Sequence, residues 1–147
     1  MASTARTHRP WFWLACLLTL VATAALTAQG GRTVWDGVYT EAQAVRGAAL
    51  YSQRCANCHG ATLGGVEAAP ALTGTTFLST WEGVPLGELA DRIRISMPQD
   101  NPSSLSRAQT ADLLAYILQA GQFPTGGNDL PSDSTLLGQI TLRSTKP

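Results

Sequence analysis

The sequence predicts an all-α domain. Apolar residues recur at three- and four-residue intervals in three segments, capping residues, proline or glycine bound these segments, and strand-like alternation is weak throughout. At 147 residues, with 44% hydrophobic and 14% charged, the chain has enough apolar material for one compact domain but not comfortably for two. The formal net charge is zero and no cluster of Lys and Arg follows the first ten residues, so nothing indicates nucleic-acid binding.

The first thirty residues differ in composition from the rest of the chain. A basic start at Arg6 and Arg9 precedes residues 10–31, which carry no charged side chain. This pattern predicts an export signal over residues 1–28, with small residues near its end that suit cleavage. Its apolar part, residues 11–28, is also just long enough for a membrane span. We therefore expect a periplasmic protein, which is anchored to the inner membrane only if residues 11–28 are retained.

The first predicted helix covers residues 41–54, after a short glycine-containing entry segment at residues 29–39. Thr40 and Gln43 have the form of a capping box at its start. Gly47 inside the helix costs about 1 kcal/mol relative to alanine. We interpret this glycine as a point of close approach by another helix, in preference to a merely flexible spot.

A long loop is predicted over residues 60–80, which contain four glycines and one proline and lose helical periodicity. Loops of that length in a compact domain are uncommon unless they enclose a ligand or carry a function. A second helix is predicted from Pro85 to near Ile95. Two prolines then follow within six residues and cannot continue the helix, so Met97 is expected in a stiff loop.

The strongest helix signal begins after Ser106, which forms a second capping box with Gln109, and ends at Gly121. It predicts a core helix that completes a domain over residues 40–123. The tail, residues 124–147, is rich in Gly, Ser, Thr, Asp and Pro and is predicted to be extended and partly docked. Its apolar anchors are Leu136, Leu137, Ile140 and Leu142.

The motif that carries chemistry comes directly after the first helix. Cys55-Ala56-Asn57-Cys58-His59 matches C-x-x-C-H, the attachment signature for c-type haem. Cysteines three residues apart lie on one face at a helix end, so both thiols can reach the two vinyl groups of one porphyrin. The adjacent His59 then points its imidazole at the iron from the same side. The motif predicts one covalently attached haem c.

Three other roles for the two cysteines are less well supported. A thioredoxin-like redox pair belongs near a βαβ pattern, which the sequence lacks. A zinc site normally needs four protein ligands, whereas the exported part offers two cysteines and one histidine. A structural disulfide across two intervening residues would be strained.

Met97 is the predicted second iron ligand, because the exported part contains no other methionine and no second histidine. Histidine and methionine together fill both axial positions and favour outer-sphere electron transfer over oxygen or peroxide chemistry. The alternative is a gap-filling core methionine. Pro70 is a candidate for the carbonyl that accepts the other ring N–H of His59, since ligating histidines generally donate that proton. The alternative for Pro70 is an ordinary loop proline.

The motif C-A-N-C-H, the downstream Met-Pro and a last helix reading L-L-A-Y-I-L resemble the class I cytochrome c family over residues 40–123. The resemblance implies about three main helices wrapped around one covalently bound haem, long loops, and first and last helices that cross near Gly47. It also implies a set of haem-binding residues, namely Cys55, Cys58, His59, Met97 and Pro70.

The expected function is electron transfer between redox proteins, without catalysis. A peroxidase-like enzyme or a ligand sensor is the alternative if Met97 does not hold the iron or is easily displaced. A membrane-anchored subunit of a dehydrogenase or oxidase is a further alternative if residues 11–28 are retained. The tail is similar to that of bacterial cytochrome c proteins that occur with quinoprotein dehydrogenases. The expected partners are therefore redox proteins such as a quinoprotein dehydrogenase or a terminal oxidase.

Overall fold

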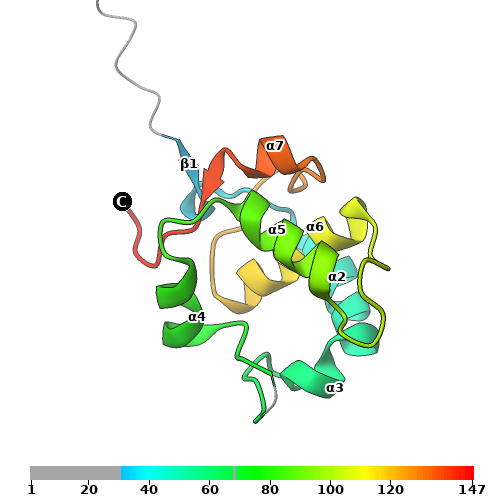
Figure 1. Cartoon of the computed structure of the whole chain (residues 1–147). Coiled ribbons are helices and arrows are strands. Elements are labelled where there is room, and N and C mark those ends of the chain that lie inside the picture. The colour runs from blue at the N-terminus through cyan, green and yellow to red at the C-terminus, as the bar shows by residue number, and fades with distance from the viewer. Residues whose placement is uncertain (1–30, 68) are drawn as a thin grey trace, which may run out of the picture. The chain divides into compact units, whose positions relative to one another are not determined.

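The computed structural model describes residues 31–67 and 69–147, so the predicted export segment at residues 1–28 lies outside the described part. Helices dominate this part, as Figure 1 shows, and the predicted all-α class is confirmed. None of these helices has the length and apolar character that crossing a membrane requires. In chain order the elements are β1 (Arg32–Thr33), the 3-10 helix η1 (Val34–Asp36), α2 (Glu41–Arg54), α3 (Ala56–His59), α4 (Gly74–Trp81), α5 (Leu86–Ser96), α6 (Arg107–Ala120), α7 (Ser134–Leu137) and β2 (Ile140–Thr141).

Helices α2 and α6 cross in close contact at Gly47. A β-carbon built on Gly47 would lie 1.9 Å from the carbonyl oxygen of Asp112 and 2.9 Å from the β-carbon of Tyr116. Real β-carbons do not approach backbone atoms that closely, so only glycine fits here. The predicted close approach of a second helix at Gly47 is confirmed.

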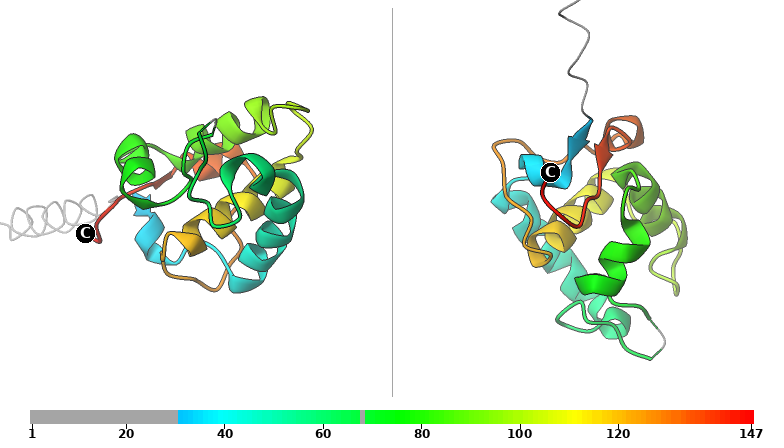
Figure 2. Two further views of the ribbon diagram at one scale, coloured as in Figure 1. Left: turned by 90° about the horizontal axis from the view of Figure 1, so that it is seen from below. Right: turned by 90° about the vertical axis from the view of Figure 1, so that its left-hand side faces the viewer.

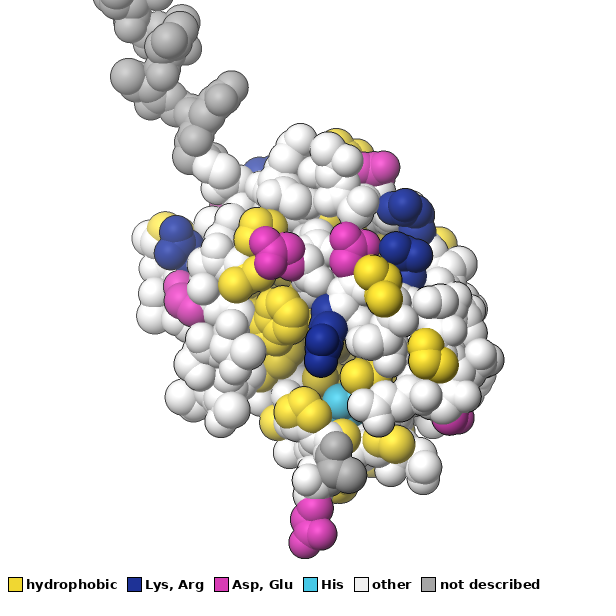
Figure 3. Space-filling model, viewed as in Figure 1, with side chains coloured by type: hydrophobic (Ala, Val, Ile, Leu, Met, Phe, Trp, Pro, Cys, Tyr) yellow, Lys and Arg dark blue, Asp and Glu magenta, His cyan; other side chains and the backbone are white. Residues whose placement is uncertain are grey.

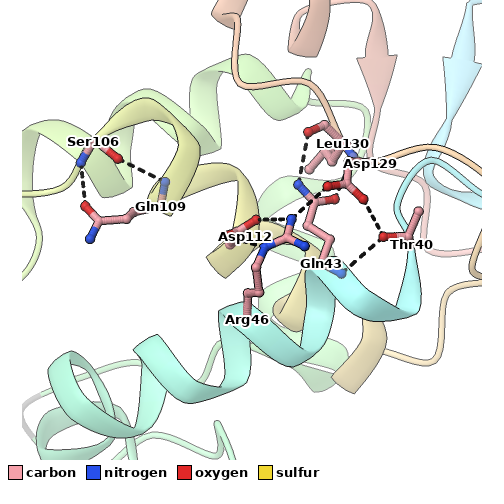
Figure 4. A network of polar contacts seen from close by, with 8 residues as sticks. All are labelled: Thr40, Gln43, Arg46, Ser106, Gln109, Asp112, Asp129 and Leu130. Atoms are coloured by element: carbon pink, nitrogen blue, oxygen red, sulfur yellow. Dashed lines mark hydrogen bonds and ion pairs between the residues drawn. The ribbon is translucent and has the colours of Figure 1, made fainter.

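The N-terminus of α2 differs from its prediction in one half of the capping box. The Thr40 hydroxyl accepts a hydrogen bond from the Gln43 N–H at 3.1 Å, as expected. The Gln43 side chain, however, is buried and bonds Leu130 twice. Its Nε2 donates to the Leu130 carbonyl at 3.0 Å and its Oε1 accepts from the Leu130 N–H at 2.6 Å (Figure 4). The second half of that prediction is wrong, because the glutamine meets backbone groups 87 residues away.

The other capping box is present in full. Gln109 accepts from the Ser106 N–H at 2.9 Å, and the Ser106 hydroxyl accepts from the Gln109 N–H at 3.2 Å. This reciprocal pair, also drawn in Figure 4, starts α6 at the predicted position.

An ion-pair network joins α2, α6 and the tail beside Gln43 (Figure 4). Arg46 lies between two carboxylates, 3.0 Å from Asp112 and 2.7 Å from Asp129, and the Thr40 hydroxyl donates to Asp129. Both carboxylates accept hydrogen bonds from the Arg46 guanidinium, and these bonds raise the pKa of Arg46. Because half of the Arg46 side chain is exposed, we assign these pairs a role in orientation more than in stability.

A helix, α4, occupies part of the segment predicted as a long loop. Its N-cap, Thr73, makes no side-chain capping bond, and six of its eight residues are Gly, Ser, Thr or Trp, which are weak helix formers. Its Phe77 is buried in the core, and the ring centroid lies 6.4 Å from that of the half-buried Trp81. The loop prediction for residues 74–80 is wrong because this tertiary burial outweighs the local sequence signal.

The tail is docked along most of its length, whereas the sequence predicted an extended and partly docked segment. It forms α7 and β2, and it buries Leu130, Leu137, Ile140 and Leu142. The predicted anchor Leu136 is instead 50% exposed.

Strand β2 ties the tail to the start of the described chain. It pairs in parallel with β1, so that the start of the described chain and the C-terminal tail lie side by side in Figure 2. Just beyond it, Leu142 exchanges backbone hydrogen bonds with Gly83 and Val84, in the turn before α5. The tail thus connects the entry segment to the turn between α4 and α5.

Candidate haem-binding site

The two cysteines lie where α2 passes into the one-turn helix α3. Cys55 is the junction, because its N–H donates to the Tyr51 carbonyl at 2.9 Å and its own carbonyl accepts from the His59 N–H at 2.9 Å. The Cys58 N–H also bonds the Cys55 carbonyl, at 3.1 Å. No disulfide joins the two thiols, of which Cys55 is half-buried and Cys58 exposed. Burial raises the pKa of the Cys55 thiol, and the Arg54 guanidinium offsets part of this rise.

His59 is buried, with 8% of its surface exposed, and its ring has a fixed partner. Its Nδ1 lies 2.8 Å from the Pro70 carbonyl oxygen. Because a carbonyl oxygen can only accept, Nδ1 carries the ring proton and donates it. The lone pair of a neutral imidazole is then on Nε2, which is the arrangement that a metal-ligating histidine requires.

Gly65 allows the Pro70 carbonyl to reach His59. Its φ is +76°, and a β-carbon there would lie 2.6 Å from the Ala71 nitrogen and 2.8 Å from the Ala69 oxygen. Its N–H donates to the His59 carbonyl at 2.9 Å, so it holds the histidine backbone while the proline holds the ring. Sequence reasoning gave this glycine no role. A pair of adjacent glycines shortly after the motif was the available signal.

A Gly65→Ala variant is expected to separate His59 from Pro70. The positive φ and the crowding at Ala71 together should lower the free energy of unfolding by about 2–3 kcal/mol. Thermal unfolding measures this loss, and solvent exchange of the His59 Nδ1 proton reports the broken contact. Gly64→Ala is the matched control, because a β-carbon there meets only the Thr62 hydroxyl, at 3.5 Å. Equal stability of the two variants would contradict the assignment.

Met97 is the C-cap residue of α5. Its N–H donates to the Ile93 carbonyl at 2.9 Å, and its side chain is half-buried. The loop after it folds back on the helix through the Ser103 hydroxyl, which donates to the Ile95 carbonyl at 3.3 Å. The geometry thus joins His59 to Pro70 directly, whereas Met97 comes from a separate element and touches neither of them through a hydrogen bond.

The surroundings of these residues are mostly apolar. In Figure 3 the histidine, in cyan, lies among apolar side chains in yellow, and a basic side chain in dark blue lies next to it. From Cys55 to Trp81 the sequence carries one charged residue, Glu67. Half-buried apolar side chains of α4, α5 and the loop before them pack on the core in this region, among them Leu72, Leu78, Trp81 and Ile93.

The donor set and its surroundings fit a haem c. The site offers two unpaired thiols for vinyl groups, an imidazole with its Nε2 available, a thioether on another element, and apolar side chains to cover a porphyrin. Within residues 31–67 and 69–147, no three His, Cys, Asp or Glu side chains gather as ligands for a metal ion by themselves.

This fold and motif together define a class: the chain contains a cytochrome c domain. A family model described as cytochrome c oxidase, cbb3-type, subunit III matches residues 42–117, just over half of the chain, and the chain belongs to this family. Membership implies covalently bound haem c and haem-based electron transfer.

Comparison with solved structures finds similarity to the crystal structure of the sulfane dehydrogenase SoxCD from Paracoccus pantotrophus. The identity is 20% and the TM-score 0.43, over 83% of this chain and 60% of that chain. The present chain therefore spans less than two thirds of that solved chain. No curated protein matches the sequence.

Proposed function

We propose that this chain is an exported mono-haem cytochrome that carries single electrons between redox proteins and catalyses no reaction of its own. In this proposal Cys55 and Cys58 form the thioethers, and His59 and Met97 are the axial iron ligands. The observation that carries the proposal is the 2.8 Å contact of His59 Nδ1 with the Pro70 carbonyl. That contact selects the tautomer whose Nε2 can bind iron, beside two thiols spaced for covalent attachment.

Each protein group has a separate part in this function. A bound haem supplies an iron that changes its charge by one electron. The Pro70 carbonyl orients the His59 ring and increases its basicity, and the Met97 sulfur would fill the second axial position and so keep water and oxygen away from it. The exposed side of Cys58 leaves the attachment region near the surface, where a partner protein can approach.

The proposed partners are redox proteins. The family description names a subunit of a terminal oxidase, which makes an oxidase of that kind one candidate for the electron acceptor. The tail resemblance noted from the sequence adds a quinoprotein dehydrogenase as a candidate donor. We propose a periplasmic location, with residues 1–28 acting as an export signal or, if retained, as an anchor to the inner membrane.

Absorption spectra of the full chain, produced with haem-attachment machinery, test this function. We expect a covalent, low-spin haem in the wild type that does not bind carbon monoxide. Met97→Ala is expected to become high-spin, to bind carbon monoxide and to have a lower midpoint potential, because thioether ligation raises the potential. Ile95→Ala is the control, since this neighbouring side chain is 55% exposed and should leave the spectrum unchanged.

Two results would contradict the proposal in different ways. If the wild type binds carbon monoxide readily, the sixth position is open, and a peroxidase-like enzyme or a ligand sensor becomes the better description. If no haem is attached covalently, the assignment of Cys55, Cys58 and His59 fails altogether.

A further inference from the structure

Tyr51 contacts both ends of the C-x-x-C-H segment. Its backbone carbonyl accepts the Cys55 N–H at 2.9 Å, and its side-chain hydroxyl donates to the Gly60 carbonyl at 2.6 Å. The residue is only 2% exposed, and its ring packs against that of Tyr116 with centroids 5.3 Å apart. Burial raises the pKa of Tyr51 to about 12, so the hydroxyl keeps the proton that it donates.

The acceptor of this bond, Gly60, is the residue that follows His59. Its N–H donates to the Ala56 carbonyl at 2.9 Å and thereby ends α3. Its carbonyl receives one other backbone donor, the Leu63 N–H, at the longer distance of 3.3 Å. The hydrogen bond from the Tyr51 hydroxyl is therefore the shorter of the two that this carbonyl accepts. It fixes the end of α3 to α2.

Three contacts from two parts of the chain thus surround the histidine. Pro70 holds its ring, the Gly65 N–H holds its carbonyl at 2.9 Å, and Tyr51 holds the next peptide at 2.6 Å. The first two come from the loop after the motif, whereas Tyr51 belongs to α2. Of the three, Tyr51 alone connects the histidine segment to the crossed helix pair α2 and α6.

We propose that the Tyr51 hydroxyl is a positioning group for His59, which keeps the imidazole aligned with the Pro70 carbonyl by fixing Gly60 to α2. This inference rests on the function proposed above, because the alignment matters for an imidazole that ligates iron. Loss of the hydroxyl should let α3 shift and loosen the bond at Nδ1. A looser bond makes the ligating nitrogen less basic, which favours the reduced iron and raises the midpoint potential.

A Tyr51→Phe variant of the full haem-loaded chain tests the proposal, because it keeps the ring and removes only the hydroxyl. We expect the His59 Nδ1 proton to exchange with solvent about tenfold faster, as the loss of one hydrogen bond of ordinary net strength implies. The midpoint potential should shift upward. Tyr116→Phe is the matched control. Its ring is the other member of the same aromatic pair, and the described residues supply no hydrogen-bond partner for its hydroxyl.

The possible outcomes separate a positioning role from a structural one. If Tyr51→Phe lowers thermal stability but leaves the exchange rate and the potential unchanged, the tyrosine is only a core residue and the proposal is overturned. The proposal is also overturned if Tyr116→Phe shifts the exchange rate and the midpoint potential by as much as Tyr51→Phe does, because packing of the aromatic pair then explains both shifts. Failure of the proposed function would be visible earlier, as a wild-type spectrum without low-spin covalent haem.

Discussion

A Gly47→Ala variant is expected to lose about 3–5 kcal/mol of unfolding free energy, close to the whole stability of a marginal domain. Helix propensity alone predicts the opposite, a gain of about 1 kcal/mol. The steric effect prevails because the new methyl group would lie 1.9 Å from the Asp112 carbonyl oxygen. Relief of that overlap requires α2 and α6 to move apart along their whole contact, which opens the core between them.

Chemical denaturation of the haem-loaded wild type and of the haem-loaded Gly47→Ala variant measures this loss. Gly127→Ala is the matched control, because a β-carbon at Gly127 meets nothing within 4 Å and its φ is not in the left-handed region. It should change stability by less than about 0.5 kcal/mol. A Gly47→Ala variant as stable as this control would show that the helices do not approach as closely as described.

Removal of residues 125–147 is expected to abolish cooperative folding. The truncation takes four almost fully buried side chains out of the core, each of which contributes about 1.5–3 kcal/mol by burial. It also leaves the buried Gln43 amide without the two backbone groups of Leu130 that satisfy it. The expected measurement is the absence of a sigmoidal thermal transition by circular dichroism.

A shorter truncation is the control for this experiment. Residues 145–147 are exposed, and a chain that ends at Ser144 keeps the backbone bond of that residue to Glu82. This variant should unfold like the full chain. If the long truncation also unfolds cooperatively at the same temperature, the tail is an appendage to the domain and not part of its core.

The sequence was sufficient to predict structure where the determinants are local. Helix α6 starts at a capping box and ends at a glycine, both within its own segment, and its bounds agree with the prediction. Gly47 was informative because a glycine in an otherwise strong helix has few explanations. The sequence could not reveal α4, since burial of Phe77 stabilises a segment with weak helix propensity. Gln43 was misread for the same kind of reason, as its partner is far along the chain.

In the candidate site, too, the sequence predicts the features that depend on local spacing and misses those that depend on contacts between elements. The C-x-x-C-H spacing is a local signal, so the sequence identified Cys55, Cys58 and His59 as a unit. The choice of Pro70 came from the general need of a ligating histidine for a carbonyl partner, and the structure has these two residues in contact. The roles of Gly65 and Tyr51 depend on a positive φ and on a bond between two elements, neither of which spacing can reveal. The ligation of iron by Met97 stays a prediction.

The contacts that hold α2 in place also constrain when it can become stable during synthesis. Arg46 pairs with Asp112, 66 residues later, and Gln43 bonds Leu130, 87 residues later. Contacts of such sequence separation form only after large loops close, which slows folding. A growing chain therefore presents Cys55 and Cys58 before their supporting helix has its partners. Helix α2 acquires these two partners only when the segments with Asp112 and Leu130 are present.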